Sequence, residues 1–328
     1  MPLGPRFDDS WTPDSVRRLY YGILFLFVGI FLLYVCSLFF PPQQFPSDTY
    51  VKINRGLGIR EIARILKQNN VVRSSTLLET WVVMFGGEKK VVAGTYYFPE
   101  HEGVISVAYR LAHGDFRIKQ VKVTFPEGST VKDITKILNQ SLVDFDEKKF
   151  VSIASTSEGY LFPDTYFFSQ VEEPEDVFHT LRASFDSKIL PYSKDIEKNK
   201  QTVANIVTMA SILEAEARTD TDRAIISGIL WKRLLMGMRL QVDATFKYIN
   251  GKSTFDLTLT DLGINSPYNT YRYKGLPKGP INNPGISAIE AALRPQASPY
   301  LYYLSDKNGV MHYSKTFEEH VANKRKYL

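Results

Sequence analysis

One glutamate, Glu214, has a position in the sequence that suits proton-transfer chemistry. It lies near the end of residues 202–217, whose apolar spacing and N-terminal threonine predict a helix. At 100° per residue, Glu214 falls on the same apolar face as Val207, whereas Glu216 falls on the opposite side. The sequence therefore predicts one carboxyl group that faces the interior and one that faces outward.

An inward-facing carboxyl group has two interpretations. Burial disfavours the charged form and raises the pKa of a carboxyl, which then holds a proton at neutral pH and can act as a general acid. The alternative is a structural glutamate that bonds to a neighbouring helix or pairs with an arginine, such as Arg223 or Arg239. Helix geometry leaves both interpretations open for Glu214.

The loops that follow this helix carry the kinds of side chain that bind sugars. A polar stretch at 237–245 interrupts apolar sequence, and Pro and Gly residues stiffen loops at 266–271 and 275–285. Tyrosine rings stack on sugar rings, and amide side chains bond to hydroxyl and N-acetyl groups. Ordinary turn chemistry explains the Gly and Pro residues but not the run Tyr-Asn-Thr-Tyr. The predicted binding residues are Gln241, Asp243, Tyr268, Asn269, Thr270 and Tyr271.

An apolar run near the N-terminus determines where these residues would act. Residues 19–40 contain no charge and match the ~20 residues that a helix needs to cross a bilayer. Arg17 and Arg18 precede the run, and the next basic residue is Lys52. The positive-inside rule therefore places residues 1–18 in the cytoplasm and the remainder of the chain outside the plasma membrane.

A cleaved signal peptide is the main alternative to an anchor. Its apolar core would be shorter and would be followed by small residues at a cleavage site. Here the run ends in Leu38-Phe-Phe-Pro-Pro42, which offers no such site. We therefore expect an uncleaved single-pass anchor, followed by a short stiff linker at 41–48.

Two domains are expected beyond the linker, and together they predict an α+β protein. Residues 49–98 have the order strand–helix–helix–strand, which outlines a small carbohydrate-binding module within 49–119. A strand–turn–helix pattern at 51–66 returns at 123–138, within a larger mixed domain at 120–328. Further helices in that domain are predicted near 174–190, 202–217, 222–236 and 287–294, and a hairpin near 299–314.

Composition excludes several classes of function. The chain has one cysteine, Cys36, which lies inside the apolar run, and five scattered histidines. A disulfide framework and a Cys- or His-based metal site are therefore not expected. The formal charge of +5 suits an anionic neighbour such as a membrane surface or a wall polymer. Nucleic-acid binding is not expected, because the basicity is mild and no recognition motif occurs.

Seven segments, in order along the chain, resemble the endolytic murein transglycosylase (YceG-like) family. One such segment alone would be a weak signal, whereas the ordered set is specific. Two departures are modest: Glu-Ala-Glu-Ala where relatives often have Glu-Lys-Glu-Thr, and Lys278 where proline is common. The segments are Ala93-Gly-Thr-Tyr-Tyr-Phe98, Glu158-Gly-Tyr-Leu-Phe-Pro-Asp-Thr-Tyr166, Met209-Ala-Ser-Ile-Leu-Glu-Ala-Glu216, Gly237-Met-Arg-Leu-Gln-Val-Asp-Ala-Thr245, Tyr268-Asn-Thr-Tyr271, Gly275-Leu-Pro277 and Pro299-Tyr-Leu-Tyr-Tyr303.

The resemblance implies a single-pass inner-membrane enzyme with a lysin-motif-like module and a catalytic domain that faces the cell wall. It implies cleavage of the β-1,4 bond between N-acetylmuramic acid and N-acetylglucosamine within glycan strands, without a cofactor, and a product with a 1,6-anhydro ring. The family's catalytic glutamate matches Glu214. Relatives are thought to end nascent strands beside the penicillin-binding synthases, which makes these synthases expected partners.

A lone carboxyl group suffices for this reaction, because Glu214 can protonate the leaving oxygen and then deprotonate the sugar's own 6-hydroxyl. Two other functions compete with this interpretation. One is a hydrolase with two carboxylates, Glu214 together with Asp243 or Asp164. The other is a wall-binding anchor without catalysis, in which Glu214 is structural.

Overall fold

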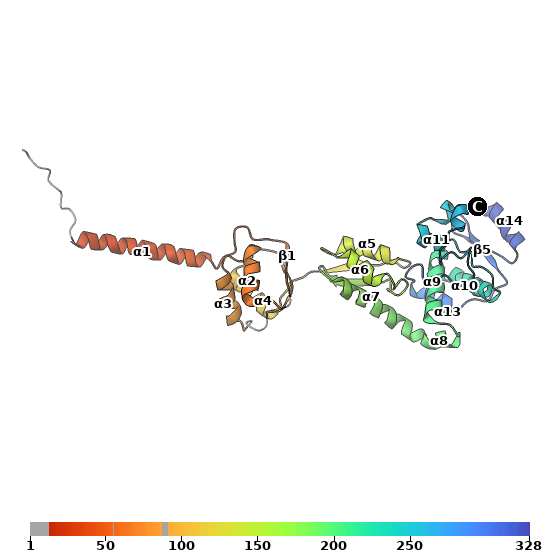
Figure 1. Ribbon diagram of the computed structural model, residues 1–328, viewed down its shortest axis with the longest axis horizontal. Coiled ribbons are helices and arrows are strands. Elements are labelled where there is room, and N and C mark those ends of the chain that lie inside the picture. The colour runs from red at the N-terminus through yellow and green to blue at the C-terminus, as the bar shows by residue number, and fades with distance from the viewer. Residues whose placement is uncertain (1–12, 55, 87–90) are drawn as a thin grey trace, which may run out of the picture. The chain divides into compact units, whose positions relative to one another are not determined.

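The computed structural model describes residues 13–54, 56–86 and 91–328 of the chain (Figure 1). It divides into two compact units, Met1–Lys119 and Gln120–Leu328. Each unit has its own apolar core.

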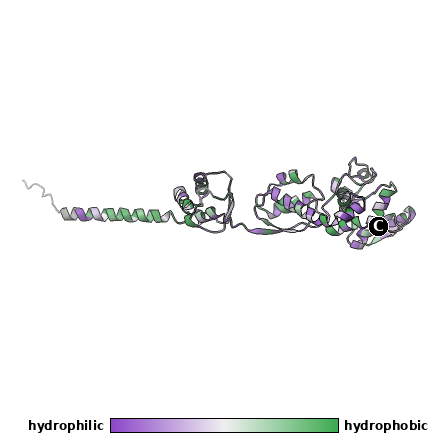
Figure 2. Cartoon of the chain, turned by 90° about the horizontal axis from the view of Figure 1, so that it is seen from below, coloured by the Kyte–Doolittle hydropathy of each residue, from purple (hydrophilic) through white to green (hydrophobic). Residues whose placement is uncertain are grey.

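The first unit begins with a long apolar helix, α1 (Pro13–Ser37). Its segment Arg17–Ser37 contains an 18-residue window with a mean hydropathy of 2.4 and is long enough to cross a membrane, a statement that rests on length and composition alone. Figure 2 shows the hydrophobic colouring along this helix. The helix ends three residues before the predicted end at Phe40, because residues 38–40 form a turn.

A small fold follows α1 in the first unit, in the predicted order strand–helix–helix–strand. It consists of β1 (Thr49–Ile53), α2 (Ile59–Gln68), α3 (Ser75–Met84) and β2 (Gly94–Phe98), and the helix α4 (Val104–His113) completes it. The two strands pair antiparallel, with Val51 opposite Tyr96. Apolar residues of both strands and all three helices form one core.

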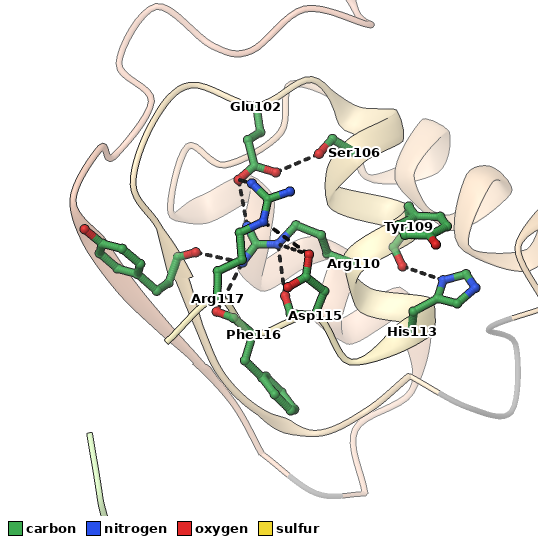
Figure 3. A network of polar contacts seen from close by, with 9 residues as sticks. Glu102, Ser106, Tyr109, Arg110, His113, Asp115, Phe116 and Arg117 are labelled. Atoms are coloured by element: carbon green, nitrogen blue, oxygen red, sulfur yellow. Dashed lines mark hydrogen bonds and ion pairs between the residues drawn. The ribbon is translucent and has the colours of Figure 1, made fainter. Parts of the chain in front are cut away.

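A buried arginine holds this small fold together, as Figure 3 shows. Arg110 on α4 is 1% exposed, and its guanidinium donates to Glu102 at 2.8 Å and to the carbonyl of Tyr97 at 2.7 Å. It also donates to the carbonyls of Asp115 and Phe116. A buried charge needs such complete pairing. The contacts tie α4 to β2 and to the chain that leaves the helix.

The second unit begins with a two-stranded sheet and three helices. The elements are β3 (Gln120–Thr124), α5 (Val131–Ser141), α6 (Glu147–Ala154), β4 (Thr165–Ser169) and α7 (Pro174–Ile189). Strands β3 and β4 pair antiparallel, with Val123 opposite Tyr166. A turn connects β3 to α5, and Gly128 takes a φ of 77° in it, a conformation that suits glycine. Gly56 has a φ of 86° at the equivalent position of the first unit.

The remaining elements of the second unit surround the helix α9 (Val203–Glu216). Eight consecutive residues, 206–213, are buried, because α9 packs against several neighbouring helices. Figure 1 shows α9 among these elements. They are η1 (Leu190–Tyr192), α8 (Ser193–Lys198), α10 (Asp220–Leu235), α11 (Ala244–Asn250), η2 (Thr254–Asp256), α12 (Leu259–Leu262), α13 (Ile286–Leu293), β5 (Tyr302–Ser305), β6 (Met311–Ser314) and α14 (Phe317–Tyr327).

Candidate active site

Glu214 lies in the last turn of α9, and its carboxyl group is fully engaged. Arg223 donates from Nη2 to Oε1 at 2.8 Å, and the backbone N–H of Gly285 donates to Oε2 at 2.9 Å. The side chain of Glu214 is 7% exposed and that of Arg223 is 10% exposed. The structure therefore contains the pair with Arg223 that the sequence offered as one possibility.

Helix ends supply both partners of Glu214. Gly285 is the N-cap of α13, where backbone N–H groups have no partner within the helix. Arg223 lies in the first turn of α10, and its Nη1 donates to Asp220 at 3.0 Å and to the Ser287 hydroxyl at 3.1 Å. Its Nε is buried and has no hydrogen-bond partner in the described part of the chain.

A second carboxyl group, Glu127, lies beside this pair. A Cβ atom built on Gly285 would lie 1.9 Å from Oε1 of Glu127, so this carboxyl packs directly on the glycine. A Cβ on Gly128 would lie 3.4 Å from Cγ of Glu214, which places the turn against Glu214 as well. Burial, and then the charge of Glu214, raise the pKa of Glu127. The side chain nevertheless belongs to an exposed residue.

Sequence reasoning missed Glu127. Its segment reads as a glycine turn between a strand and a helix, and this pattern says nothing about which distant helix the turn contacts. The predicted second carboxylates, Asp243 and Asp164, have other partners. Asp243 accepts a hydrogen bond from the hydroxyl of Tyr271, and the ammonium group of Lys188 lies 3.9 Å from Asp164.

A buried clamp fixes the turn that carries Glu127. Asn283 accepts a hydrogen bond from the N–H of Leu161 at 2.9 Å and donates to the carbonyl of Ser129 at 2.9 Å and to Glu158 at 3.1 Å. Glu158 also accepts from the N–H of Val131, at the start of α5. Burial raises the pKa of Glu158 to about 7. The clamp therefore joins the turn before α5 to the loop before α13.

Glu216 does not face outward, which corrects the helical-wheel prediction. It accepts a hydrogen bond from the N–H of Ala244 at 3.4 Å and interacts with the hydroxyl of Tyr303. Burial raises its pKa to about 7. The helical-wheel prediction assumed that one face of α9 is exposed to solvent, whereas neighbouring elements cover this helix on nearly all sides.

Next to Glu216, Asp243 and Tyr271 form a hydrogen bond of 2.5 Å, and burial raises the pKa of both groups. Asp243 and Glu216 interact electrostatically. The structure thus brings two of the predicted binding residues, Asp243 and Tyr271, into a polar network close to the end of α9.

Asn269 and Thr270 are each 1% exposed, and their polar atoms are used within the protein. Asn269 donates to the carbonyls of Leu262 and Ile264 and accepts from two N–H groups of its own loop. Thr270 accepts from the N–H of Val242 at 2.9 Å. These contacts support a role in holding the loop.

Gln241 and Tyr268 remain accessible to different degrees. Gln241 is exposed, has a φ of 51°, and bonds through its N–H to the carbonyl of Thr270 at 3.1 Å. Tyr268 is half-buried, and its ring lies 4.9 Å from that of Tyr248. An open pocket of about 530 Å³ lies on the same loop, lined by Asn265, Pro267, Tyr273, Leu276 and Lys278. Among the described residues, no group of three or more His, Cys, Asp or Glu side chains is placed to hold a metal ion.

Comparison with known proteins assigns the family. The model of the YceG-like family matches residues 51–326. An endolytic murein transglycosylase of Bacillus subtilis is 33% identical, with 92% of this chain and 91% of that protein covered. One from Streptococcus pneumoniae serotype 2 is 27% identical, with 86% and 59% covered. The crystal structure of a YceG-like protein from Listeria monocytogenes has 30% identity and a TM-score of 0.54, with 84% and 98% covered. This chain therefore belongs to the YceG-like family.

Proposed function

We propose that this protein is an endolytic murein transglycosylase that cleaves glycan strands of peptidoglycan. The observation that carries the proposal is the match to the Bacillus subtilis enzyme along nearly the full length of both chains. The residues of the site agree with it, because Glu214 lies beside a second carboxyl group, an arginine and a helix N-terminus. Such groups are suited to proton transfer and to a developing charge.

The proposed reaction breaks the β-1,4 bond between N-acetylmuramic acid and N-acetylglucosamine. The 6-hydroxyl of the muramic sugar attacks its own C1, so the product has a 1,6-anhydro ring and no water is consumed. Glu214 is the proposed catalytic carboxylate, which receives the proton of the 6-hydroxyl. A charged partner such as Arg223 would hold it in one orientation throughout the reaction.

The test of this proposal is the variant Glu214→Gln in the full chain, purified in detergent and supplied with peptidoglycan glycan strands. We expect turnover to fall by about 10²–10⁴, the usual contribution of acid–base catalysis. The amide oxygen keeps an acceptor for Arg223 while the N–H of Gly285 loses its own, so the circular dichroism spectrum should keep its helical signal although the variant is less stable. Glu197→Gln, an exposed change on α8, is the matched control. Near-wild-type cleavage by Glu214→Gln would reject the assignment.

A hydrolase is the second candidate, and the closeness of Glu127 to Glu214 is the observation that favours it. Mass spectrometry of the products separates the two enzymes. A transglycosylase gives ends that lack the elements of water, whereas a hydrolase adds water at each cut. A wall-binding anchor without catalysis would give no products at all.

We propose that Gln241, Tyr268 and Tyr271 contact the glycan, together with Asp243, and that Asn269 and Thr270 position their loop. The exposure of Gln241 and Tyr268 and the saturated contacts of Asn269 and Thr270 support this division. The small fold at 49–119 is the proposed lysin-motif-like module, and its β–α–α–β order supports a role in glycan binding.

We further propose that α1 anchors the protein in the plasma membrane, with residues 1–18 in the cytoplasm and the catalytic domain at 120–328 outside. The length and hydropathy of Arg17–Ser37 support the anchor, and the two arginines before the apolar run support the orientation. In this position the enzyme would end nascent strands beside the penicillin-binding synthases.

A further inference from the structure

We propose that Glu127 is the proton donor to the leaving oxygen, and that Glu214 acts as the base. This inference rests on the proposed transglycosylase function and divides between two side chains the roles that one carboxylate would otherwise fill. It makes Glu127 a catalytic residue on a different element from Glu214. The turn before α5 thereby becomes part of the active site.

Gly285 contacts both acids. The Glu127 carboxyl packs on this glycine, and the N–H of the same glycine donates to Glu214. The turn at Gly128 packs against the Glu214 side chain itself. Asn283 and Glu158 fix this arrangement, because they connect the turn to the loop that contains Gly285.

Each carboxyl oxygen of Glu214 already accepts a bond, one from Arg223 and one from the Gly285 N–H. Both of these partners are donors, and each oxygen keeps a lone pair that can accept the proton of the 6-hydroxyl. Glu214 is therefore suited to the role of base.

Glu127 is exposed, whereas the side chain of Glu214 is 7% exposed. Glu127 is therefore the more accessible of the two acids. The raised pKa of Glu127, caused by burial and by the charge of Glu214, helps it to keep a proton until the substrate arrives.

The proposed step balances. Glu127 gives its proton to the glycosidic oxygen, and the bond between that oxygen and C1 breaks with the electron pair leaving on the oxygen. The 6-hydroxyl oxygen then bonds to C1, and its proton passes to Glu214. The products are the 1,6-anhydro end and a free 4-hydroxyl, and the proton returns from Glu214 to Glu127 through solvent.

The experiment compares two substrates in the full chain in detergent. Natural glycan strands need a proton on the leaving oxygen, whereas a 4-nitrophenyl glycoside of the N-acetylglucosaminyl–N-acetylmuramic acid disaccharide has a leaving group that departs without one. We expect Glu127→Gln to lose about 10²–10⁴ in turnover on glycan strands. The same variant should cleave the 4-nitrophenyl glycoside at close to the wild-type rate. Glu214→Gln should be slow on both substrates.

A second variant tests the same role without touching either acid. In Gly285→Ala, the new Cβ would displace the flexible end of Glu127, while the backbone N–H remains for Glu214. We expect Gly285→Ala to lose turnover on glycan strands and to keep it on the 4-nitrophenyl glycoside, as is expected of Glu127→Gln. Glu197→Gln, an exposed change on α8, is again the control.

The outcomes separate this inference from the proposed function. The role of Glu127 is wrong, and the function stands, if wild type forms anhydro ends and Glu127→Gln keeps the wild-type rate on glycan strands. The same conclusion follows if Glu127→Gln loses turnover on both substrates to the same extent. If wild type adds water or forms no product, the function itself is wrong. Glu197→Gln should match wild type on both substrates.

Discussion

Glu214 and Glu216, at the end of α9, have different hydrogen-bond and ion-pair partners. Glu214 pairs with Arg223, whereas Glu216, two residues later, bonds to Tyr303 and to a backbone N–H. Burial raises the pKa of Glu216 and favours its protonated form.

The raised pKa of Glu216 predicts that the stability of the protein depends on pH. The pKa of Glu216 is raised from 4.5 to about 7, so the folded state binds its proton more tightly than the unfolded state. Its contribution is fully present below pH 4.5 and is lost as the pH rises through 7. Glu216→Gln should therefore lose less stability between pH 5 and pH 8 than wild type, by at most on the order of 3 kcal/mol. Hydrogen exchange of the α9 amides at pH 5 and pH 8 measures this change in stability.

The pKa of Glu158 is also raised to about 7, and Glu158 therefore also lowers the stability as the pH rises. Glu216→Gln should thus keep part of the pH dependence of stability. Glu197→Gln is the control and should follow the wild-type profile. An unchanged profile in Glu216→Gln would mean that Glu216 is ionised in the folded protein across this range.

At the scale of elements, the site depends on two connecting segments that come from distant parts of the second unit. The turn at 126–130 leads into α5, and the loop at 280–285 leads into α13. Asn283 joins them, and an isolated bridge pairs it with Ser129. Both segments precede a helix, so their backbone N–H groups are available to carboxylates.

Asn283→Ala should therefore damage both stability and activity. It removes the partner of the buried N–H of Leu161 and the donor to the carbonyl of Ser129, and each unsatisfied buried group costs about 1–3 kcal/mol. We expect a loss of about 2–4 kcal/mol, measured by urea unfolding. The control is Asn308→Ala, in an exposed turn. A loss no larger than in this control would show that the clamp is unimportant.

At the scale of the whole molecule, the chain combines one long apolar helix with two compact units, each with its own core. The proposed substrate is a polymer that lies beyond the plasma membrane. A tether next to the membrane would keep the enzyme near newly made strands, and the net charge of +5 suits an anionic wall.

The anchor makes a prediction for fractionation. The full chain should remain with membranes after an alkaline carbonate wash and be released by detergent, because about 20 apolar residues in a bilayer are not extracted by high pH. A chain that lacks residues 1–40 should be soluble. Alkaline phosphatase fused after Leu328 should be active, since it would lie outside the cytoplasm. An inactive fusion, or a full chain released by carbonate, would contradict the proposal.

The sequence by itself predicted features that depend on local pattern. The apolar run of α1, the strand–helix–helix–strand order of 49–98 and the ends of α7 and α9 follow from periodicity, capping and turn residues, and each lies within a few residues of its prediction. Helices α6, α8, α11, α12 and α14 were not predicted, because four of them are short and the last is polar along much of its length.

Only the tertiary structure decided which groups meet at Glu214. Three features depend on how other elements enclose α9. They are the pairing of Glu214 with Arg223, the inward position of Glu216 and the approach of Glu127. Helical periodicity gives the direction of a side chain around its own axis, but it contains no information on the segment that packs there. The family resemblance pointed to Glu214 as the candidate, and packing between elements distant in sequence determined its partners.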